Sequence, residues 1–420
     1  MAEAGEQSGP QGLISAAGGA ATPPPDTVKR ALQAVRSHLG MEVAYVSEFV
    51  DDRSVFREVD APGLEALIKV GDSYSLDDVY CRHILEGRLP QLIADTSAEP
   101  FAMAMPITKS VPIGAHMSVP LLLPDGRPFG MFCCLSPQPN PTLNQRDLQM
   151  MKAFADLAAF EINRDMEASH AEKEKRARIR TVMEAKQLSI VYQPIWNVET
   201  HRPVGMECLA RFSATPVRSP DLWFAEAAEV GLGNELELAA IGAALSAGPS
   251  FPHDIYLAIN ASPETILSGA FPAALEAAPM NRIVLEITEH APVSDYACLL
   301  DALAPLRAGG LQLAVDDAGA GYSSLQHILH LRPDLIKLDM GLTRHIDLDP
   351  VRRALAAALI GFARDTGSRI IAEGVETPSE LATLRTLGVQ QAQGYLLGRP
   401  MPFEAARKLF NAGTSALRVA

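Results

Sequence analysis

Eight short apolar runs in the second half of the 420-residue chain each carry polar groups of a catalytic type at or near their ends. Most of the runs are separated by a stretch long enough for a helix. The runs are Ile190–Ile195, Pro203–Arg211, Ile255–Asn260, Ile283–Glu289, Leu311–Asp317, Leu335–Asp339, Arg369–Glu376 and Gln390–Gly398. Strand–helix alternation repeated eight times is typical of an α/β barrel of the TIM type, (β/α)8, whose strand ends meet at one face and form the active site.

The connection between the first two runs departs from this pattern. It spans only Trp196–Arg202, whereas a crossover between parallel strands needs about a dozen residues or more. We therefore expect an antiparallel first strand in the barrel, joined to the second strand by a hairpin at Asn197–Arg202.

The strand ends are rich in oxygen donors. A single acid at a strand end is more often a cap or an ion-pair partner, but six such groups at successive strand ends are hard to explain in that way. Gathered carboxylates repel one another unless cations lie between them, and oxygen-only sites suit Mg²⁺ or Mn²⁺ rather than zinc. Two such ions about 4 Å apart can catalyse phosphodiester hydrolysis. The candidate metal ligands are Glu207, Asn260, Glu286, Asp316, Asp317 and Glu373.

The charge balance argues against a general binder of polyanions. Lys and Arg total 36 against 50 Asp and Glu, which gives a formal net charge of −14. The chain thus has no basic excess to neutralise the phosphates of DNA or RNA. A substrate that carries phosphate would have to be held by local arginines or by metal ions.

Membrane and secretion signals are not apparent in the sequence. No apolar run approaches the ~18 residues of a membrane span, and the first residues have neither the basic start nor the apolar segment of a secretory signal. The five cysteines show no zinc-type spacing. We therefore expect a reduced, cytoplasmic protein.

The first half of the chain divides into a tail, a domain and a linker. Residues 1–25 are rich in Gly, Ala and Pro and predict a disordered tail. Residues 26–165 predict a helix, a series of strands and a closing helix over about 144–163, an α+β layout. Residues 166–185 predict a charged helical linker, either a solvated helix or one that carries a signal between domains. The expected strands are Met41–Val50, a segment around Phe56, Gln91–Ala94, His116–Leu123 and Phe129–Leu135.

Residues 26–165 resemble a GAF domain, a sensory domain. The resemblance rests on the element order, on Met41–Phe49 and on Val111–Leu135. It implies a pocket for a small molecule that the sequence does not identify, although such a domain can also serve only for dimerisation. Cys81 and His83 are not adjacent, which argues against a bilin attachment site.

The barrel segment, which we place at 186–414, resembles the EAL family of bacterial cyclic di-GMP phosphodiesterases. The motifs that carry the resemblance occur in the order found in the family. They are Tyr192–Ile195, Glu207–Arg211, Ile259–Asn260, Leu285–Glu289, Asp316–Leu325, Ile336–Asp339, Ala372–Glu376, Gln393–Tyr395 and Arg399–Pro400. No segment resembles the GG[DE]EF motif of cyclases, so cyclase activity is not supported.

The resemblance implies a role for each candidate residue. Glu207, Asn260, Glu286, Asp316, Asp317 and Glu373 would bind metal, with Asp317 shared with the second ion. Glu373 would also orient or deprotonate the attacking water, and Lys337 would contact that water or the scissile phosphate. Arg211 would hold a phosphate, and Gln193, Leu209 and Gln393 would bind the dinucleotide. Glu289 would anchor the loop Asp317–Ser324, which links the metal site to the dimer interface.

The implied reaction is metal-dependent hydrolysis of cyclic di-GMP to linear pGpG, a step of second-messenger signal transduction. Mg²⁺ or Mn²⁺ would be the cofactor, the protein would be a homodimer, and the GAF-like domain would regulate it. One alternative is a receptor that binds cyclic di-GMP without hydrolysis and acts through a protein partner. Another is an interaction module that has lost both properties. The intact metal-site residues argue against the first, and Gln193, Arg211 and Gln393 against the second.

Two features depart from the family pattern. Cys208 replaces the alanine of the family's name, but it should face away from the metals because strand neighbours alternate. Ala318 and Ala320 stand where many members have Phe and Thr. We expect these smaller side chains to loosen the loop and to affect regulatory coupling more than the supply of metal ligands.

Overall fold

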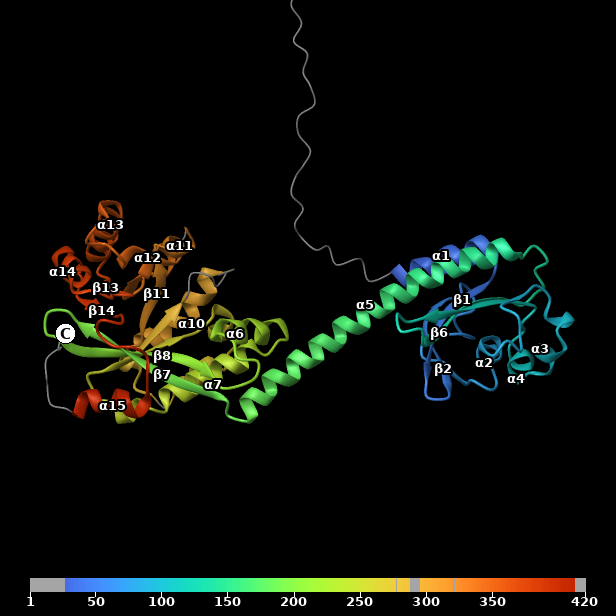
Figure 1. Cartoon of the computed structure of the whole chain (residues 1–420), viewed down its shortest axis with the longest axis horizontal. Helices are drawn as coiled ribbons and strands as arrows, with labels where there is room; N and C mark the ends of the chain where they lie inside the picture. Colours follow the sequence, from blue (N-terminus) through green and yellow to red (C-terminus); the bar gives the residue numbers. More distant parts are fainter. Residues whose placement is uncertain (1–26, 277, 288–294, 320–321, 412–420) are drawn as a thin grey trace, which may run out of the picture. The chain divides into compact units, whose positions relative to one another are not determined.

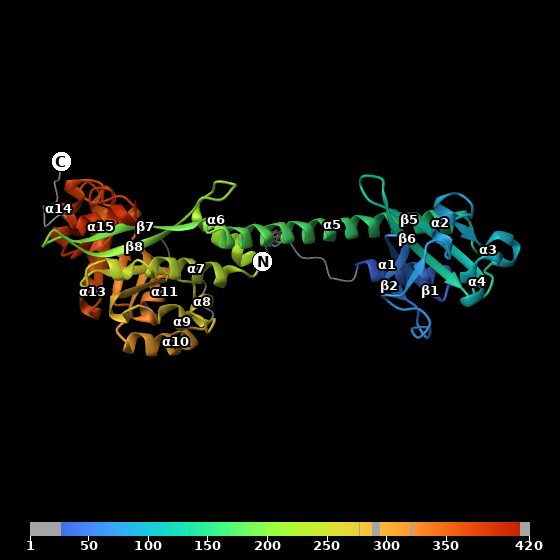
Figure 2. The same ribbon diagram turned by 90° about the horizontal axis from the view of Figure 1, so that it is seen from below.

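A computed structural model describes residues 27–276, 278–287, 295–319 and 322–411 (Figure 1 and Figure 2). The side chains of residues 322–324 and 411 are not described. The chain divides into two compact units, Met1–His170 and Ala171–Ala420. Within the described ranges, no helix is both long and apolar enough to cross a membrane. The expected disordered tail, residues 1–25, lies outside the described residues.

The first unit is built on a six-stranded antiparallel sheet of order β3-β2-β1-β6-β5-β4 (Figure 1). Its strands are β1 (Val43–Val50), β2 (Arg53–Asp60), β3 (Ser73–Ser75), β4 (Leu92–Ile93), β5 (Ala115–Leu122) and β6 (Pro128–Ser136). Its helices are α1 (Thr27–Leu39), α2 (Tyr80–Leu85), the 3₁₀ turn η1 (Thr96–Ala98), α3 (Pro100–Ala104), α4 (Pro106–Ser110) and the first part of α5 (Gln145–Glu184). The α+β class predicted from sequence is confirmed. The short strand β3 was not predicted, because three half-buried residues carry no alternation of polarity.

Both faces of this sheet are buried, as the alternation along β1 illustrates. Ala44 and Val46 belong to a core shared with α1 and α5, whereas Val43 and Tyr45 belong to a second core that includes α2. Successive residues of a strand face opposite sides of the sheet, so the mostly apolar start of β1 supplies both cores. Each fully buried aliphatic side chain contributes about 1.5–3 kcal/mol.

A single helix, α5, occupies the region that the sequence divided into a closing helix and a linker. It runs over 40 residues, and its residues belong to the first unit up to His170 and to the second unit from Ala171. The apolar spacing that marks a core-facing helix fades near Asn163, which explains the shorter prediction. The helix continues because the next residues are mostly Glu, Lys, Arg and Ala, which are strong helix formers.

The second unit is a barrel. Its sheet has the order β14-β13-β12-β11-β10-β9-β8-β7-β15, and pairing between β14 and β7 closes it. The strands are β7 (Leu188–Asn197), β8 (Arg202–Phe212), β9 (Tyr256–Asn260), β10 (Ile283–Ile287), β11 (Gln312–Ala318), β12 (Leu335–Leu338), β13 (Arg369–Ala372), β14 (Gln391–Ala392) and β15 (Met401–Pro402). β7 runs antiparallel to β8 and β14, whereas β8 to β14 run parallel to one another. The predicted TIM-type barrel with an antiparallel first strand is confirmed.

Helices surround the barrel and cover its outer apolar face (Figure 1). They are α6 (Pro220–Glu229), α7 (Gly233–Leu245), α8 (Pro263–Leu267), α9 (Phe271–Leu275), α10 (Tyr296–Ala308), α11 (Tyr322–Leu331), α12 (Met340–Thr343), α13 (Pro350–Thr366), α14 (Pro378–Leu387) and α15 (Phe403–Asn411), with the 3₁₀ turns η2 (Gly248–Ser250) and η3 (Met280–Arg282). The short strand β15, which was not predicted, pairs with β7 next to the closed barrel.

Two layers of side chains fill the barrel interior. The apolar layer consists of Ile195, Ala258, Val284, Ala314, Leu335 and Ile371. Side chains on a strand face the same side every second residue, so the position two residues nearer the strand C-terminus also points inward. Those positions hold Asn260, Glu286, Asp316, Lys337 and Glu373, while antiparallel β7 contributes Gln193 by counting backward. The apolar layer therefore closes one side of the polar layer.

The first unit encloses a small cavity of about 30 Å³ beside His116 on β5. Aromatic side chains of Tyr45, Phe56, Tyr74 and Tyr80 line it. His116 is 2% exposed, and its Nδ1 has no hydrogen-bond partner among the described residues. Burial lowers the pKa of His116 to about 3. The imidazole is therefore neutral in the folded protein at pH 7.

We predict that the first unit loses stability as the pH falls below about 6.5, the ordinary pKa of histidine. His116 stays neutral in the folded state but takes up a proton in the unfolded state, so the loss grows from pH 6.5 toward pH 3, at about 1.4 kcal/mol per pH unit. His116→Gln removes this dependence and flattens the pH profile. Hydrogen–deuterium exchange of the β5 peptide between pH 7 and pH 5, corrected for the intrinsic rate, measures it.

His38→Gln is the matched control, because His38 lies on α1 with a side chain 62% exposed. This control should keep the wild-type slope. Equal slopes in wild type and His116→Gln would contradict the prediction.

Candidate metal centre and binding pocket

Lys337 lies at the centre of an acidic cluster at the C-terminal ends of the barrel strands. Its Nζ lies 2.7 Å from Glu373 Oε1, 3.0 Å from Glu286 Oε2, 3.1 Å from Asp316 Oδ1 and 3.3 Å from Glu207 Oε1. The side chains of Lys337 and Glu286 have no exposed surface. Four carboxylates thus surround one ammonium group, which leaves an excess of negative charge.

The pKa values of these groups reflect that excess. Burial raises the pKa of Glu286 well above its usual range, and the neighbouring carboxylates raise it further against the opposing effect of Lys337. Burial likewise raises the pKa of Glu373 to about 8. Burial alone would lower the pKa of Lys337, but the carboxylates of Asp316, Glu207, Glu286 and Glu373 together raise it above its usual value. The lysine is therefore charged at pH 7.

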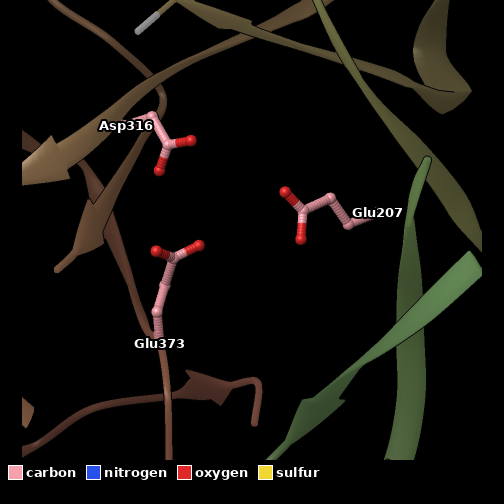
Figure 3. A group of neighbouring side chains, drawn as sticks. All are labelled: Glu207, Asp316 and Glu373. Atoms are coloured by element: carbon pink, nitrogen blue, oxygen red, sulfur yellow. The ribbon is translucent and has the colours of Figure 1, made fainter. Parts of the chain in front are cut away.

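Three of these carboxylates form a group with the geometry of a metal site. One oxygen each of Glu207, Asp316 and Glu373 lies within 4.8 Å of the others, and Figure 3 shows the three side chains pointing toward a common space. Glu286 adds an Oε1 that is buried and has no hydrogen-bond partner among the described residues. These donors are all carboxyl oxygens, so they fit a hard cation such as Mg²⁺ or Mn²⁺, which would displace any proton that they carry.

Amide side chains border the acidic cluster. Asn260 at the end of β9 donates from Nδ2 to Glu286 Oε2 at 3.4 Å. Gln393, which follows β14 and is buried, donates from Nε2 to Glu207 Oε2. Gln193 on β7 is also buried, but it donates to the Gly398 carbonyl at 3.0 Å instead. The structure therefore brings Asn260 and Gln393 into contact with the cluster, while Gln193 contacts the segment that leads to β15.

The cluster adjoins a pocket of about 350 Å³ between β8, β9 and the helices α6 and α7. Leu209, Arg211 and Asn260 line it together with Phe224 and Glu237. Its volume lies in the range of small-molecule sites, which combine apolar walls with a few polar groups. Arg211 is half-buried, and its Nη1 donates to the Ala210 carbonyl at 2.7 Å. The pocket therefore holds a guanidinium group and is linked to the candidate metal centre through Asn260, which contacts Glu286.

Two backbone positions with positive φ hold the strand ends of the cluster. Gly374, which follows Glu373, has φ 64°, and a Cβ there would lie 2.4 Å from Met340 Cβ, so only glycine fits. Asp317 has φ 53°, and its backbone N–H donates to Asp316 Oδ1 at 2.9 Å. Asp317 is half-buried and is not part of the three-carboxylate group.

Some predicted residues lie elsewhere or outside the described residues. Glu289 and Ala320 fall outside the described ranges, as does part of the loop Asp317–Ser324. Cys208 is buried in the core outside the barrel, while its neighbour Glu207 faces the interior, as the alternation predicted. Ala318 is fully buried at the end of β11.

Sequence reasoning missed the helical wall of the pocket. Pro220, Asp221 and Phe224 come from α6, and Glu237 comes from α7. Glu237 Oε2 accepts hydrogen bonds from the backbone N–H and the hydroxyl of Ser262, at 2.8 and 3.0 Å. The one signal that could have indicated these residues is their place in the connection between β8 and β9, since such connections build the sites of barrels.

The fold is a barrel of parallel strands with one antiparallel strand, and its site is a cluster of carboxylates suited to a metal ion. A sequence profile of the EAL domain matches residues 176–400, and a profile of the GAF domain matches residues 21–163. The EAL match covers more than half of the chain. The chain therefore belongs to the EAL domain family and carries a GAF domain before its EAL domain, which confirms both resemblances.

Curated relatives match mainly the second half of the chain. A cyclic di-GMP phosphodiesterase of Pseudomonas aeruginosa is 32% identical over 50% of this chain and 38% of its own length. The probable cyclic di-GMP phosphodiesterase PdeI of Escherichia coli is 32% identical over 54% of this chain and 31% of its own length. An uncharacterized signaling protein of Caulobacter vibrioides is 30% identical over 64% of this chain and 36% of its own length. The chain spans about a third of the length of these relatives.

Solved structures share the fold. The MucR phosphodiesterase of Pseudomonas aeruginosa, in complex with cyclic di-GMP, matches with a TM-score of 0.51 and 28% identity over 56% of this chain and 99% of that chain. An EAL enzyme named Bd1971, bound to cAMP and cyclic di-GMP, matches with a TM-score of 0.54 and 19% identity over 88% of this chain and 93% of that chain. The second likeness concerns the fold alone.

We predict that Mg²⁺ or Mn²⁺ stabilises the second unit. A cation that binds only the folded state adds about 2.7 kcal/mol at 100 times its dissociation constant. Glu207→Gln and Glu373→Gln should lose most of this gain, because each replaces a carboxylate ligand by a neutral amide. Thermal unfolding followed by tryptophan fluorescence measures the gain, since both tryptophans, Trp196 and Trp223, lie in this unit.

Glu376→Gln is the matched control. Glu376 lies three residues after Glu373, but its partly exposed carboxylate pairs with Arg344. The control should keep the full thermal shift. A shift of wild-type size in Glu207→Gln would show that the cation binds elsewhere.

Proposed function

We propose that this protein hydrolyses cyclic di-GMP to linear pGpG in a metal-dependent reaction that its GAF domain regulates. The observation that carries the proposal is the cluster of Glu207, Glu286, Asp316 and Glu373 around Lys337, next to a pocket that contains Arg211. Membership of the EAL family and relatives that are cyclic di-GMP phosphodiesterases support the choice of substrate.

The chain offers oxygen donors for two cations. Glu207, Asn260, Glu286, Asp316, Asp317 and Glu373 would hold Mg²⁺ or Mn²⁺. When bound, these ions would polarise the attacking water and offset the charge that develops on the phosphate oxygens. They would also relieve the repulsion that raises the pKa of Glu286 and Glu373.

The side chains perform the remaining tasks. Glu373 orients the attacking water and accepts its proton, while the Lys337 ammonium faces that water or a phosphate oxygen. Arg211 holds a phosphate through its planar guanidinium, and Gln193, Leu209 and Gln393 contact the dinucleotide. Water attacks phosphorus in line, the P–O3′ bond breaks, and the 3′ oxygen leaves and takes up a proton to give pGpG.

The wider biology belongs to the same proposal. The protein acts as a homodimer in the cytoplasm, and Glu289 anchors the loop after the double aspartate. A small molecule bound to the GAF domain is the signal that controls turnover.

The test is turnover by the full chain with cyclic di-GMP and Mg²⁺ or Mn²⁺, with products separated by chromatography. We expect pGpG with the cation and none with EDTA. Glu207→Ala should reduce turnover by about 10²-fold or more, because the cluster loses a charged oxygen donor. Glu376→Gln should turn over at close to the wild-type rate.

Three outcomes would contradict parts of the proposal. Wild-type turnover by Glu207→Ala, with its thermal unfolding unchanged, would refute the metal assignment. Tight binding of cyclic di-GMP without product would instead identify a receptor. Neither binding nor product with any cation would refute the choice of substrate.

A further inference from the structure

Helix α6 contains a buried acid that pairs with arginines from two sides. Glu226 Oε1 lies 2.8 Å from Arg178 Nε of α5, and Glu226 Oε2 lies 2.5 Å from Arg218 Nη1 of the β8–α6 connection. The Glu226 side chain is only 9% exposed. Burial would raise the pKa of Glu226, but the two arginines together lower it below its usual range. The carboxylate is therefore charged, and both of its oxygens are engaged.

The last turns of α5 pack on α6 around this ion pair. Ile179 and Val182 are buried in one apolar cluster with Trp223 of α6. The Arg218 guanidinium lies 3.8 Å from the centre of the Trp223 ring. Its Nε and Nη2 are buried without a hydrogen-bond partner in the described part of the chain. Glu226 is thus the group that compensates this buried cation.

An adjoining side of α6 forms a wall of the pocket. Phe224 lines the cavity together with Arg211 and Asn260. Phe212, the residue after Arg211, stacks on Trp223 at 5.3 Å and meets Phe224 edge to face at 5.7 Å. A chain of contacts therefore leads from α5 through α6 to the arginine of the pocket.

We propose that Glu226 is a positioning residue: by tying Arg178 of α5 to α6, it fixes the Phe224 wall and the Arg211 end of the pocket. The cluster of Arg178, Glu226 and Arg218 makes the affinity of the pocket for a cyclic dinucleotide depend on where α5 lies. The choice of ligand in this inference rests on the function proposed above. The positioning role of Glu226 rests on the contacts alone.

An ion pair suits this task better than an apolar contact would. Apolar side chains can slide past one another at similar energy, whereas a buried carboxylate loses much of its stabilisation when its hydrogen-bonded partners move. A shift or rotation of α5 that separates Arg178 from Glu226 therefore carries α6 along or leaves a buried charge half-paired. Either response changes the wall of the pocket.

The test compares Glu226→Gln with Glu229→Gln in the full chain. Both substitutions remove one negative charge from α6, but Glu229 pairs with Lys175 on the surface, with a side chain 59% exposed. We expect Glu226→Gln to raise the KM for cyclic di-GMP by about fivefold or more, a size typical of coupled positions. Its kcat should stay within about twofold, since the acidic cluster is untouched. Glu226→Asp should restore part of the affinity.

The outcomes that overturn the proposal are specific. Equal KM values in Glu226→Gln and Glu229→Gln would overturn it, and so would a fall in kcat at unchanged KM. If Glu226→Gln does not fold, Arg178→Gln replaces it, because Glu226 then keeps Arg218. An unchanged KM in Arg178→Gln would overturn the proposal equally.

A ligand-free measurement separates this inference from the proposed function. In a Trp196→Phe background, Trp223 is the only tryptophan of the chain, and it lies between Arg218 and Phe212. Glu226→Gln should shift its emission and speed hydrogen exchange at residues 209–212, whereas Glu229→Gln should do neither. If neither the emission nor the hydrogen exchange changes in Glu226→Gln, the positioning role is refuted, even if wild-type protein turns over cyclic di-GMP. Wild-type protein without turnover refutes the proposed function instead.

Discussion

The buried ammonium of Lys337 is the interaction on which the second unit depends. A lysine without exposed surface is tolerated only when it is paired, and here four carboxylates on different segments surround it. A shift of one residue in the register of any of these strands would turn its acid toward the outer core. The cluster is therefore a constraint on the barrel as well as a chemical centre. The apolar layer from Ile195 to Ile371 supplies burial that offsets part of its cost.

The barrel and its polar layer could be predicted from the sequence because both follow from the alternation of side chains along a strand, in which every second residue faces the same side. An apolar strand residue such as Val284 or Ala314 fixes the face of the acid two residues later, and parallel strands bring those acids together. The antiparallel β7 followed from the length of one connection. Strand ends were less predictable: β14 has only two paired residues, whereas its apolar run is far longer, because a strand ends where its pairing ends.

The pocket wall and the Glu226 pairs could not be predicted, for a different reason. Arg178 and Glu226 are 48 residues apart, and they meet only because α5 and α6 pack on Trp223. Charged residues on a helix usually face solvent, so the charged sequence of α5 gives no indication that Arg178 pairs with a buried acid on α6. The unbroken course of α5 was obscured similarly, since its second half carries few apolar residues at helical spacing.

The acidic cluster and the pocket wall are held in place by different interactions. Three of the acids lie on strands that pair on both sides, Glu373 directly follows β13, and all four share one buried cation, so a small movement of an outer helix leaves their geometry intact. The wall opposite Arg211 lies on α6, a helix held by side-chain packing and by Glu226. Packed helices can shift by an ångström or two where strands within a closed barrel cannot. Under the proposed function, a movement of α5 would therefore act first on the pocket wall that binds the substrate, and the acidic cluster would be the last part of the site to change.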